Sequence, residues 1–346
     1  MSYPASLSWL LLVAFPLFAP NGAAQQPAPF IDTHVHPAES IGEMTPEVFI
    51  STALRVMEAN GIEKTVILPP PTAPDRGQGW RNRFQSFADA AKGRPRSFAF
   101  AAGGEFLNPM IQSTPSNSVT AEIRREFEAI AQKLIAAGTS AFGEFAAQTF
   151  FVGQFPYMPA PPDHPLFFLL ADLAARHGLP IDLHMEALPD DGWMPSLGSP
   201  RDRRVQRENR NPTNFSANLP AFERLLAHEP KAKIIWAHAG WDNTGERTVE
   251  LMRRLLAAHI NLYMSIKFDS RTPGKTPIMN GDRIRADWLQ LLRDFPDRFV
   301  IGSDQFYDED PGIRINRVRP FIDALPPPLA ALIGRENAIR IYRLPP

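Results

Sequence analysis

Cysteine is absent from this chain of 346 residues. The absence excludes disulfide bonds, cysteine nucleophiles and thiolate metal ligands, so any metal site must be built from histidine and carboxylate side chains. An excess of charge of one sign is also lacking, since 36 Lys and Arg stand against 37 Asp and Glu. A protein that binds nucleic acid carries a basic excess, so we expect no nucleic-acid partner.

The apolar run near the start of the chain, from Trp9 to Phe18, is too short to span a bilayer. Small residues at Pro20–Ala24 follow it and are typical of a cleavage site. No Lys or Arg occurs before Arg55, so the positive charge of a signal peptide rests on the amino terminus alone. The pattern still predicts a secretory signal peptide over residues 1–24 and an exported protein, periplasmic or extracellular, with no stable membrane span. An uncleaved segment that tethers the chain to a membrane is the alternative.

Strand and helix patterns alternate from residue 30 to the end of the chain. Apolar runs predict strands at 30–36, 64–69, 97–103, 139–146, 180–186, 233–239, 260–266 and 299–304. Helical patterns lie at 46–60, 83–92, 119–137, 165–177, 218–228, 245–258, 284–294, 314–324 and 328–341. Eight strands, each followed by a helix, are typical of a (β/α)8 TIM barrel, which we expect to form one domain over residues 25–346. A doubly wound open sheet is the rival fold.

The connections between these elements differ in length on the two sides of the predicted barrel. Connections from helix to strand are short, as at Gly178–Pro180, whereas those from strand to helix are long, at 147–164, 187–217, 267–283 and 305–313. TIM-barrel enzymes build their active sites from the loops that follow the strands. The sequence therefore predicts a catalytic face formed by long strand-to-helix loops.

His34 and His36 stand one residue apart at the end of the first predicted strand. Because side chains alternate across a strand, the two imidazoles point the same way. Imidazole is the commonest protein ligand for a transition metal, and two on one face supply half of a site.

Other predicted strands also end in residues that can bind a metal ion, namely Glu144, His184, His238 and Asp304. Only a closed sheet would gather the ends of strands one, four, five, six and eight around one centre, which favours the barrel over the open sheet. The remaining four of the eight histidines lie at ends of helical patterns, where we expect structural roles. They are His164, His177, His228 and His259.

These motifs, taken in order, resemble the metal-dependent amidohydrolase superfamily, specifically its amidohydrolase-related branch. The resemblance covers residues 28–343 and rests on Asp32-Thr-His34-Val-His36, Gly143-Glu144, His184, His238, Ser303-Asp304 and Glu336-Asn337-Ala338-Ile-Arg340. It implies an enzyme that acts on a small-molecule substrate with one or two divalent metal ions, zinc being favoured and manganese the alternative.

We assign His34, His36 and Asp304 to one ion, with Asp304 also taking the proton from attacking water. In binuclear members of the superfamily a carboxylate on strand four bridges two ions, so Glu144 could bridge, with His184 and His238 on the second. In mononuclear members His184 joins the first ion, and His238 contacts the substrate or the water. We favour the binuclear arrangement.

Charged residues beside these positions suggest supporting roles. Asp182 and Glu186 share the face of His184, so one of them could orient an imidazole, and Asp32 precedes His34 by the same spacing. Lys267 could contact an anionic group of the substrate. Aromatic residues and an Arg-rich run from Arg201 to Arg210 occupy the long loops. They suit a pocket for an aromatic or apolar acid or ester, or a surface through which the chain forms a homo-oligomer.

Three functions are compatible with these residues. The leading one is a metal-dependent hydrolase of the amidohydrolase type that cleaves an ester, lactone or amide by metal-activated water. The second is a metal-dependent decarboxylase acting on an aromatic or unsaturated acid. The third is an exported metal-binding barrel without turnover.

Overall fold

The computed structural model describes residues 28–37, 44–75, 78–150, 156–193, 211–241, 243–268, 277–307 and 314–345, and the side chains of 78–83 are not described. The predicted signal peptide, residues 1–24, and the Arg201–Arg210 run lie outside the described residues.

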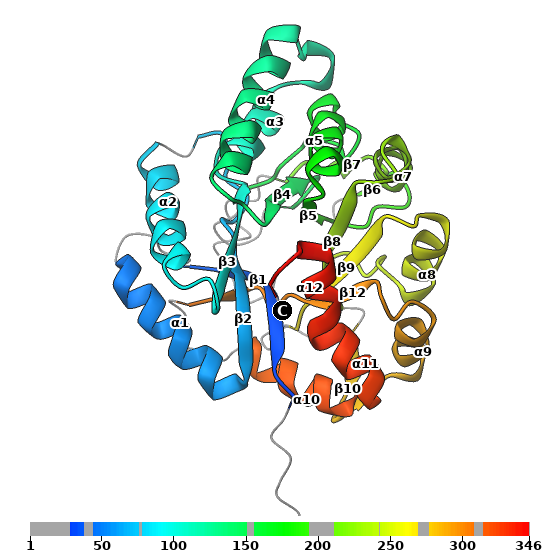
Figure 1. The fold of residues 1–346 in the computed structure, drawn as a ribbon. Helices are drawn as coiled ribbons and strands as arrows, with labels where there is room; N and C mark the ends of the chain where they lie inside the picture. The colour runs from blue at the N-terminus through cyan, green and yellow to red at the C-terminus, as the bar shows by residue number, and fades with distance from the viewer. Residues whose placement is uncertain are drawn as a thin grey trace, which may run out of the picture.

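Eight parallel strands form the centre of the molecule (Figure 1). They are β1 (Phe30–His36), β2 (Ile62–Ile67), β3 (Phe98–Gly103), β4 (Ala141–Ala147), β5 (Pro180–Met185), β8 (Lys233–Ala239), β9 (Leu262–Ile266) and β12 (Phe299–Ile301). Each pairs with the next in this order, and β12 also pairs with β1, where Asp32 lies opposite Ile301. The sheet is therefore closed, and the prediction of a TIM barrel over an open sheet is confirmed.

Helices cover the outside of the barrel (Figure 1). They are α1 (Pro46–Asn60), α2 (Gln78–Lys92), α4 (Ala121–Ala136), α5 (Pro165–His177), α7 (Leu219–His228), α8 (Val249–Ala258), α9 (Ala286–Asp294) and α10 (Val318–Ala324). Their apolar faces and the outward side chains of the strands form one continuous core. Hydroxyl caps begin several of these helices: Thr45, Thr120 and Thr248 each accept a hydrogen bond from the third helical amide.

The C-terminal segment lies across the amino end of the barrel (Figure 1). Helix α11 (Pro327–Ala331), a π-helical turn (Leu332–Glu336) and α12 (Asn337–Tyr342) form it where the sequence predicts one helix over 328–341. Ile341 and Tyr342 pack in one cluster with inward-facing strand residues such as Ile31 and Val300. The amide of Asn337 donates to the carbonyls of Pro296 and Phe299, at the start of β12. This end of the barrel is thus covered by protein.

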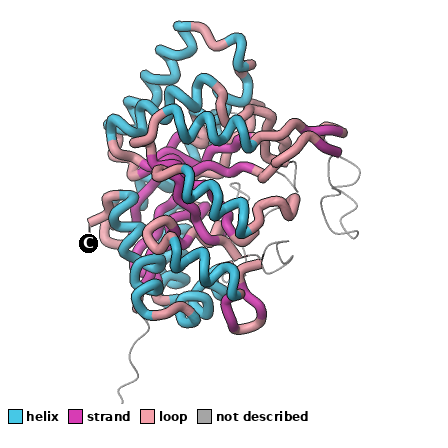
Figure 2. Tube along the Cα trace, turned by 90° about the vertical axis from the view of Figure 1, so that its right-hand side faces the viewer, coloured by secondary structure: helices cyan, strands magenta, loops and turns pink. Residues whose placement is uncertain are grey.

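Two short antiparallel strand pairs project at the opposite, carboxyl end, within the predicted long loops (Figure 2). In one, β6 (Gly192–Trp193) pairs with β7 (Asn214–Phe215), and in the other β10 (Met279–Asn280) pairs with β11 (Arg283–Ile284). Trp193, one of the aromatic residues of these loops, leaves 77% of its surface exposed.

Several predicted boundaries differ from the structure. The strand predicted at 64–69 is β2, which starts at Ile62 because Gly61 ends α1 in the left-handed conformation and leaves no linker. The strand predicted at 299–304 ends at Ile301, and pairing with β1 resumes at β13 (Gln305–Phe306). Helix α3 (Leu107–Ser113), followed by a 3-10 turn at Ser116–Ser118, was not predicted, because seven residues are too few to show a helical pattern.

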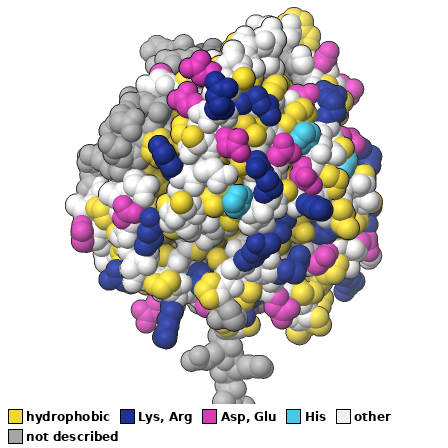
Figure 3. All heavy atoms as spheres, turned by 45° about the horizontal axis from the view of Figure 1, so that its top comes forward, with side chains coloured by type: hydrophobic (Ala, Val, Ile, Leu, Met, Phe, Trp, Pro, Cys, Tyr) yellow, Lys and Arg dark blue, Asp and Glu magenta, His cyan; other side chains and the backbone are white. Residues whose placement is uncertain are grey.

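Acidic and basic side chains are interspersed on the face shown in Figure 3, in keeping with the balanced charge of the chain. Among the described helices, none is both long and apolar enough to cross a membrane.

Candidate metal centre

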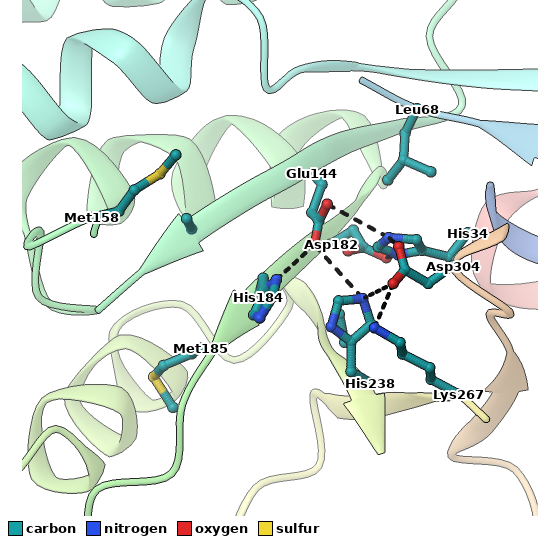
Figure 4. Close-up of polar contacts among 12 residues, drawn as sticks. His34, Leu68, Glu144, Met158, Asp182, His184, Met185, His238, Lys267 and Asp304 are labelled. Atoms are coloured by element: carbon teal, nitrogen blue, oxygen red, sulfur yellow. Dashed lines mark hydrogen bonds and ion pairs between the residues drawn. The ribbon is translucent and has the colours of Figure 1, made fainter. Parts of the chain in front are cut away.

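Six side chains converge at the carboxyl end of the barrel, where parallel strands bring their last residues together. Figure 4 labels five of them, all but His36. Strand β1 contributes two of them, and β4, β5, β8 and the turn after β12 contribute one each. Five are buried, whereas the side chain of His184 is 21% exposed and lies nearest to solvent. They are the six candidate metal ligands from the sequence: His34, His36, Glu144, His184, His238 and Asp304.

Glu144 lies in the middle of the cluster, and its two carboxylate oxygens face different histidines (Figure 4). Oε2 is 3.3 Å from His36 Nε2 and 3.6 Å from His34 Nε2. Oε1 is 3.0 Å from His184 Nδ1 and 3.7 Å from His238 Nε2. One carboxylate therefore joins two pairs of imidazoles.

Asp304 also divides its oxygens between two environments. Oδ1 is 3.1 Å from His36 Nε2 and 3.7 Å from His34 Nε2. Oδ2 turns away from this pair and forms ion pairs with Lys267 and, at 2.8 Å, with Arg314. The cations hold the carboxylate so that one oxygen points at the two imidazoles of β1.

The two histidines of β1 are held through their outer nitrogens. Nδ1 of His34 is 3.1 Å from Asp182 Oδ2, and Nδ1 of His36 is 3.0 Å from the carbonyl of Leu68. Both partners are acceptors, so each Nδ1 donates, and the Nε2 atoms face Glu144 and Asp304. This is the arrangement in which a metal-binding imidazole is usually oriented by its second nitrogen.

The backbones of β1 and β12 approach closely where they carry their site residues. Asp32 accepts hydrogen bonds from the amides of His34 and Ser303 and from the Ser303 hydroxyl. Gly302 allows the approach, because a Cβ there would lie 2.9 Å from His34 Cβ and 2.8 Å from Ser265 Cβ. These hydrogen bonds lower the pKa of Asp32, but burial outweighs them and raises it to about 6.

Neighbouring positive groups lower the pKa values of both candidate ligand carboxylates, Glu144 and Asp304. Burial opposes ionisation of Glu144, but His34, His184 and His36 outweigh it and hold the pKa of that carboxyl well below its usual range. Burial likewise opposes a charged His34, yet Asp182 and Glu144 raise its pKa well above the ordinary value. In contrast, burial together with Lys267 and His184 keeps the pKa of His238 well below its usual range.

Several nitrogen atoms of the cluster lack a hydrogen-bond partner among the described residues. They are His34 Nε2 and both ring nitrogens of His238, all buried. Ligand atoms of His34, His36 and Asp304 lie within 4.8 Å of one another, as do those of His34, Glu144 and His238. Buried polar atoms without partners are costly, and a cation would satisfy them. A donor set of imidazole and carboxylate fits zinc, and manganese less closely.

The supporting residues suggested by the sequence have different outcomes. Asp182 contacts an imidazole, as the sequence suggested, and the ring is that of His34 on the opposite strand. Glu186 contacts Asn243 instead of an imidazole. Lys267 lies over the ring of Trp241 and contacts Asp304.

Sequence reasoning missed Arg314, which carries no spacing signal and whose guanidinium contacts Asp304. It also missed Arg247, whose guanidinium donates to the backbone beside His238.

The family model described as Amidohydrolase matches residues 31–344, so the chain belongs to the amidohydrolase family. No curated protein matches the chain.

Similar solved structures include 2,6-dihydroxybenzoate decarboxylase from Rhizobium, with 16% identity and a TM-score of 0.49, over 92% of this chain and 99% of that one. Dihydropyrimidinase from Brevibacillus agri is similar over 92% of this chain and 72% of its own, with 13% identity and a TM-score of 0.49. Likeness at this level carries no argument about the reaction, so the family rests on the sequence match.

Proposed function

We propose that the protein is a metal-dependent hydrolase that cleaves an ester, lactone or amide bond of a small organic substrate. The observation that supports this most is the position of Glu144, whose two oxygens each face a separate pair of imidazoles. A carboxylate placed in this way suits a bridge between two metal ions, and two-metal sites are common in hydrolytic enzymes.

The six residues divide into two sets in this proposal. His34, His36 and Asp304 Oδ1 would hold one ion, His184 and His238 the other, and Glu144 would contribute one oxygen to each. Divalent zinc bound there supplies a Lewis acid and lowers the pKa of water from ~15.7 toward ~7, so that a nucleophile forms at neutral pH. Manganese is the alternative metal. With a single ion, His184 would join the first set.

The residues of the chain then have distinct tasks. Asp304 would also accept the proton of the attacking water, and Lys267 and Arg314 hold its carboxylate in place through Oδ2. His238 lies with its ring between those of His34 and His184, where it contacts the substrate or the water in a site with one ion. Asp182 and the Leu68 carbonyl accept the Nδ1 protons of His34 and His36, so Nε2 is the nitrogen with which each ring would bind the ion.

Metal stoichiometry and product analysis test the proposal together. Purified protein reloaded with zinc or manganese should bind close to two ions per chain by plasma mass spectrometry. It should then hydrolyse members of a panel of esters, lactones and amides, with one oxygen from H₂¹⁸O in the product. Protein that binds no divalent metal would overturn the enzyme assignment.

A metal-dependent decarboxylase that acts on an aromatic or unsaturated acid is the second candidate. It is favoured by the two positive charges of Lys267 and Arg314, which pair with Asp304 Oδ2 beside the centre and would also attract a substrate carboxylate. Release of CO₂ from a carboxylated aromatic substrate, without incorporation of oxygen from water, would decide for this reaction.

A further inference from the structure

His238 differs from the other three histidines of the centre in how its ring is held. Nδ1 of His34 contacts Asp182, Nδ1 of His36 contacts a carbonyl, and Nδ1 of His184 contacts Glu144. Neither ring nitrogen of His238 has a hydrogen-bond partner among the described residues. Its Nε2 lies 3.7 Å from Glu144 Oε1 and 4.0 Å from Asp304 Oδ2, beyond hydrogen-bond distance, so the direction of this imidazole depends chiefly on its backbone and on the rings packed around it.

The backbone at His238 leaves the regular strand. The pairing of β8 with β9 shifts register between Trp236 and Ala239, so that Ala237 and His238 form a bulge. His238 has a φ of +69°, in the left-handed region that residues other than glycine seldom adopt. Such a conformation persists only where the surrounding structure holds it.

Arg247, in the segment before α8, supplies contacts at this bulge. Nη2 donates to the carbonyl of Trp236 at 2.8 Å, and Nη1 donates to the carbonyl of Ala237. Its guanidinium stacks on the Trp236 indole, 3.9 Å from the ring centroid, and the residue is 2% exposed. Ser265 completes the arrangement, because its hydroxyl accepts from the amide of His238 at 3.4 Å.

We infer that Arg247 is the positioning residue of His238. Its planar fork binds two successive carbonyls immediately before the left-handed residue and so sets the direction in which the imidazole leaves the strand. The inference rests on the proposed function in one respect only, namely that His238 acts at the metal centre. A lysine would keep the positive charge but, as a single ammonium on a flexible stem, would not reproduce the fork or the stacking.

Histidine NMR of the metal-free protein tests the inference directly. The chain has eight histidines, so ¹³Cε1-labelled histidine gives a small set of signals, and the His238 signal is the one missing in His238→Ala. Arg247→Lys should displace or broaden that signal. The signal of His164 should stay unchanged, because this ring caps α5 and both of its nitrogens have hydrogen-bond partners away from Arg247. A matched control is Arg254→Lys, on the exposed face of α8, where the guanidinium pairs with Glu223. A His238 signal unchanged in Arg247→Lys would overturn the inference.

Zinc titration separates positioning from general support of the fold. Arg247→Lys should weaken binding at the half of the centre that contains His238 by ~10 to 100-fold, the usual effect of losing an outer partner of a metal site. In a His238→Ala background the same substitution should change the zinc isotherm no further. Equal losses in both backgrounds would show a merely structural role and overturn the inference. Wild-type protein that binds no zinc would refute the proposed function, while the NMR comparison would still decide on Arg247.

Discussion

Asp182 and His34 stand on strands at opposite sides of the barrel, and their side chains meet in its interior, with Oδ2 3.1 Å from Nδ1. The contact crosses the barrel beneath the candidate centre. Both side chains are fully or nearly fully buried, so the carboxylate is available to this imidazole with little competition from water.

Asp182→Asn is expected to weaken zinc binding by ~10 to 100-fold while leaving the fold intact, because the amide is a poorer acceptor for the His34 Nδ1 proton. Competition with a fluorescent chelator measures the affinity, and thermal unfolding of the metal-free protein controls for stability. An unchanged affinity would show that the contact does not orient the ligand.

His34→Ala and Asp304→Asn are each expected to abolish turnover, because both remove a proposed ligand of the same ion. Circular dichroism should remain that of the wild-type barrel. His228→Ala is the matched control, since this histidine pairs with Asp172 at the surface and should leave turnover unchanged. Near-normal activity in either site variant would contradict the proposed centre.

Glu144→Gln should reduce the number of bound ions from two to one, because an amide offers a single weak oxygen ligand. Plasma mass spectrometry counts the ions, and a count of two ions in the variant would exclude the bridge.

Removal of metal from the wild type by a chelator should lower the melting temperature, since a ligand present at a concentration of 100 times its Kd stabilises the folded protein by ~2.7 kcal/mol. Differential scanning calorimetry measures the change.

Gly302→Ala is expected to destabilise the barrel by roughly 1–3 kcal/mol, as overpacking of a closely packed interior does. The new methyl would press on His34 and Ser265, so zinc affinity should fall as well. Gly93→Ala is the control, because the nearest atom to the methyl added there would be a carbonyl oxygen at 3.6 Å. Urea unfolding of both variants measures the difference, and equal stabilities would contradict the close approach of β12 to β1.

Export is proposed from the sequence alone, because residues 1–24 lie outside the described part of the chain. Expression of the full-length gene in a bacterial host should yield a secreted or periplasmic protein whose first residue, by N-terminal sequencing, lies near residue 25. A protein that keeps Met1 and stays with the membrane fraction would support the tethered alternative.

Local patterns were sufficient to predict the barrel and the six residues that converge in it. Alternation along β1 places His34 and His36 on one face, and parallel strands bring Glu144, His184 and His238 to the same end.

Other features depend on contacts between distant segments. The left-handed turns at His238 and Asp304 have only a weak signal in their own residue types, because histidine and aspartate adopt this conformation more often than most residues but still seldom. Arg247 and Arg314 gain their roles only from the carbonyls and carboxylate that the fold brings to them. For the same reason the sequence suggests that Asp182 could orient an imidazole but does not say that the imidazole is that of His34, across the barrel.

The pairing of β1 with β12 has a consequence for how the protein matures. Asp32 and Ser303 are hydrogen-bonded across 271 positions of sequence, so the first strand meets its last neighbour only when nearly the whole chain is present. An unfinished chain would hold His34 and His36 without Asp304 beside them. Loading of the proposed ion would therefore follow synthesis of the complete chain, and an exported chain would take its metal from the compartment in which it folds.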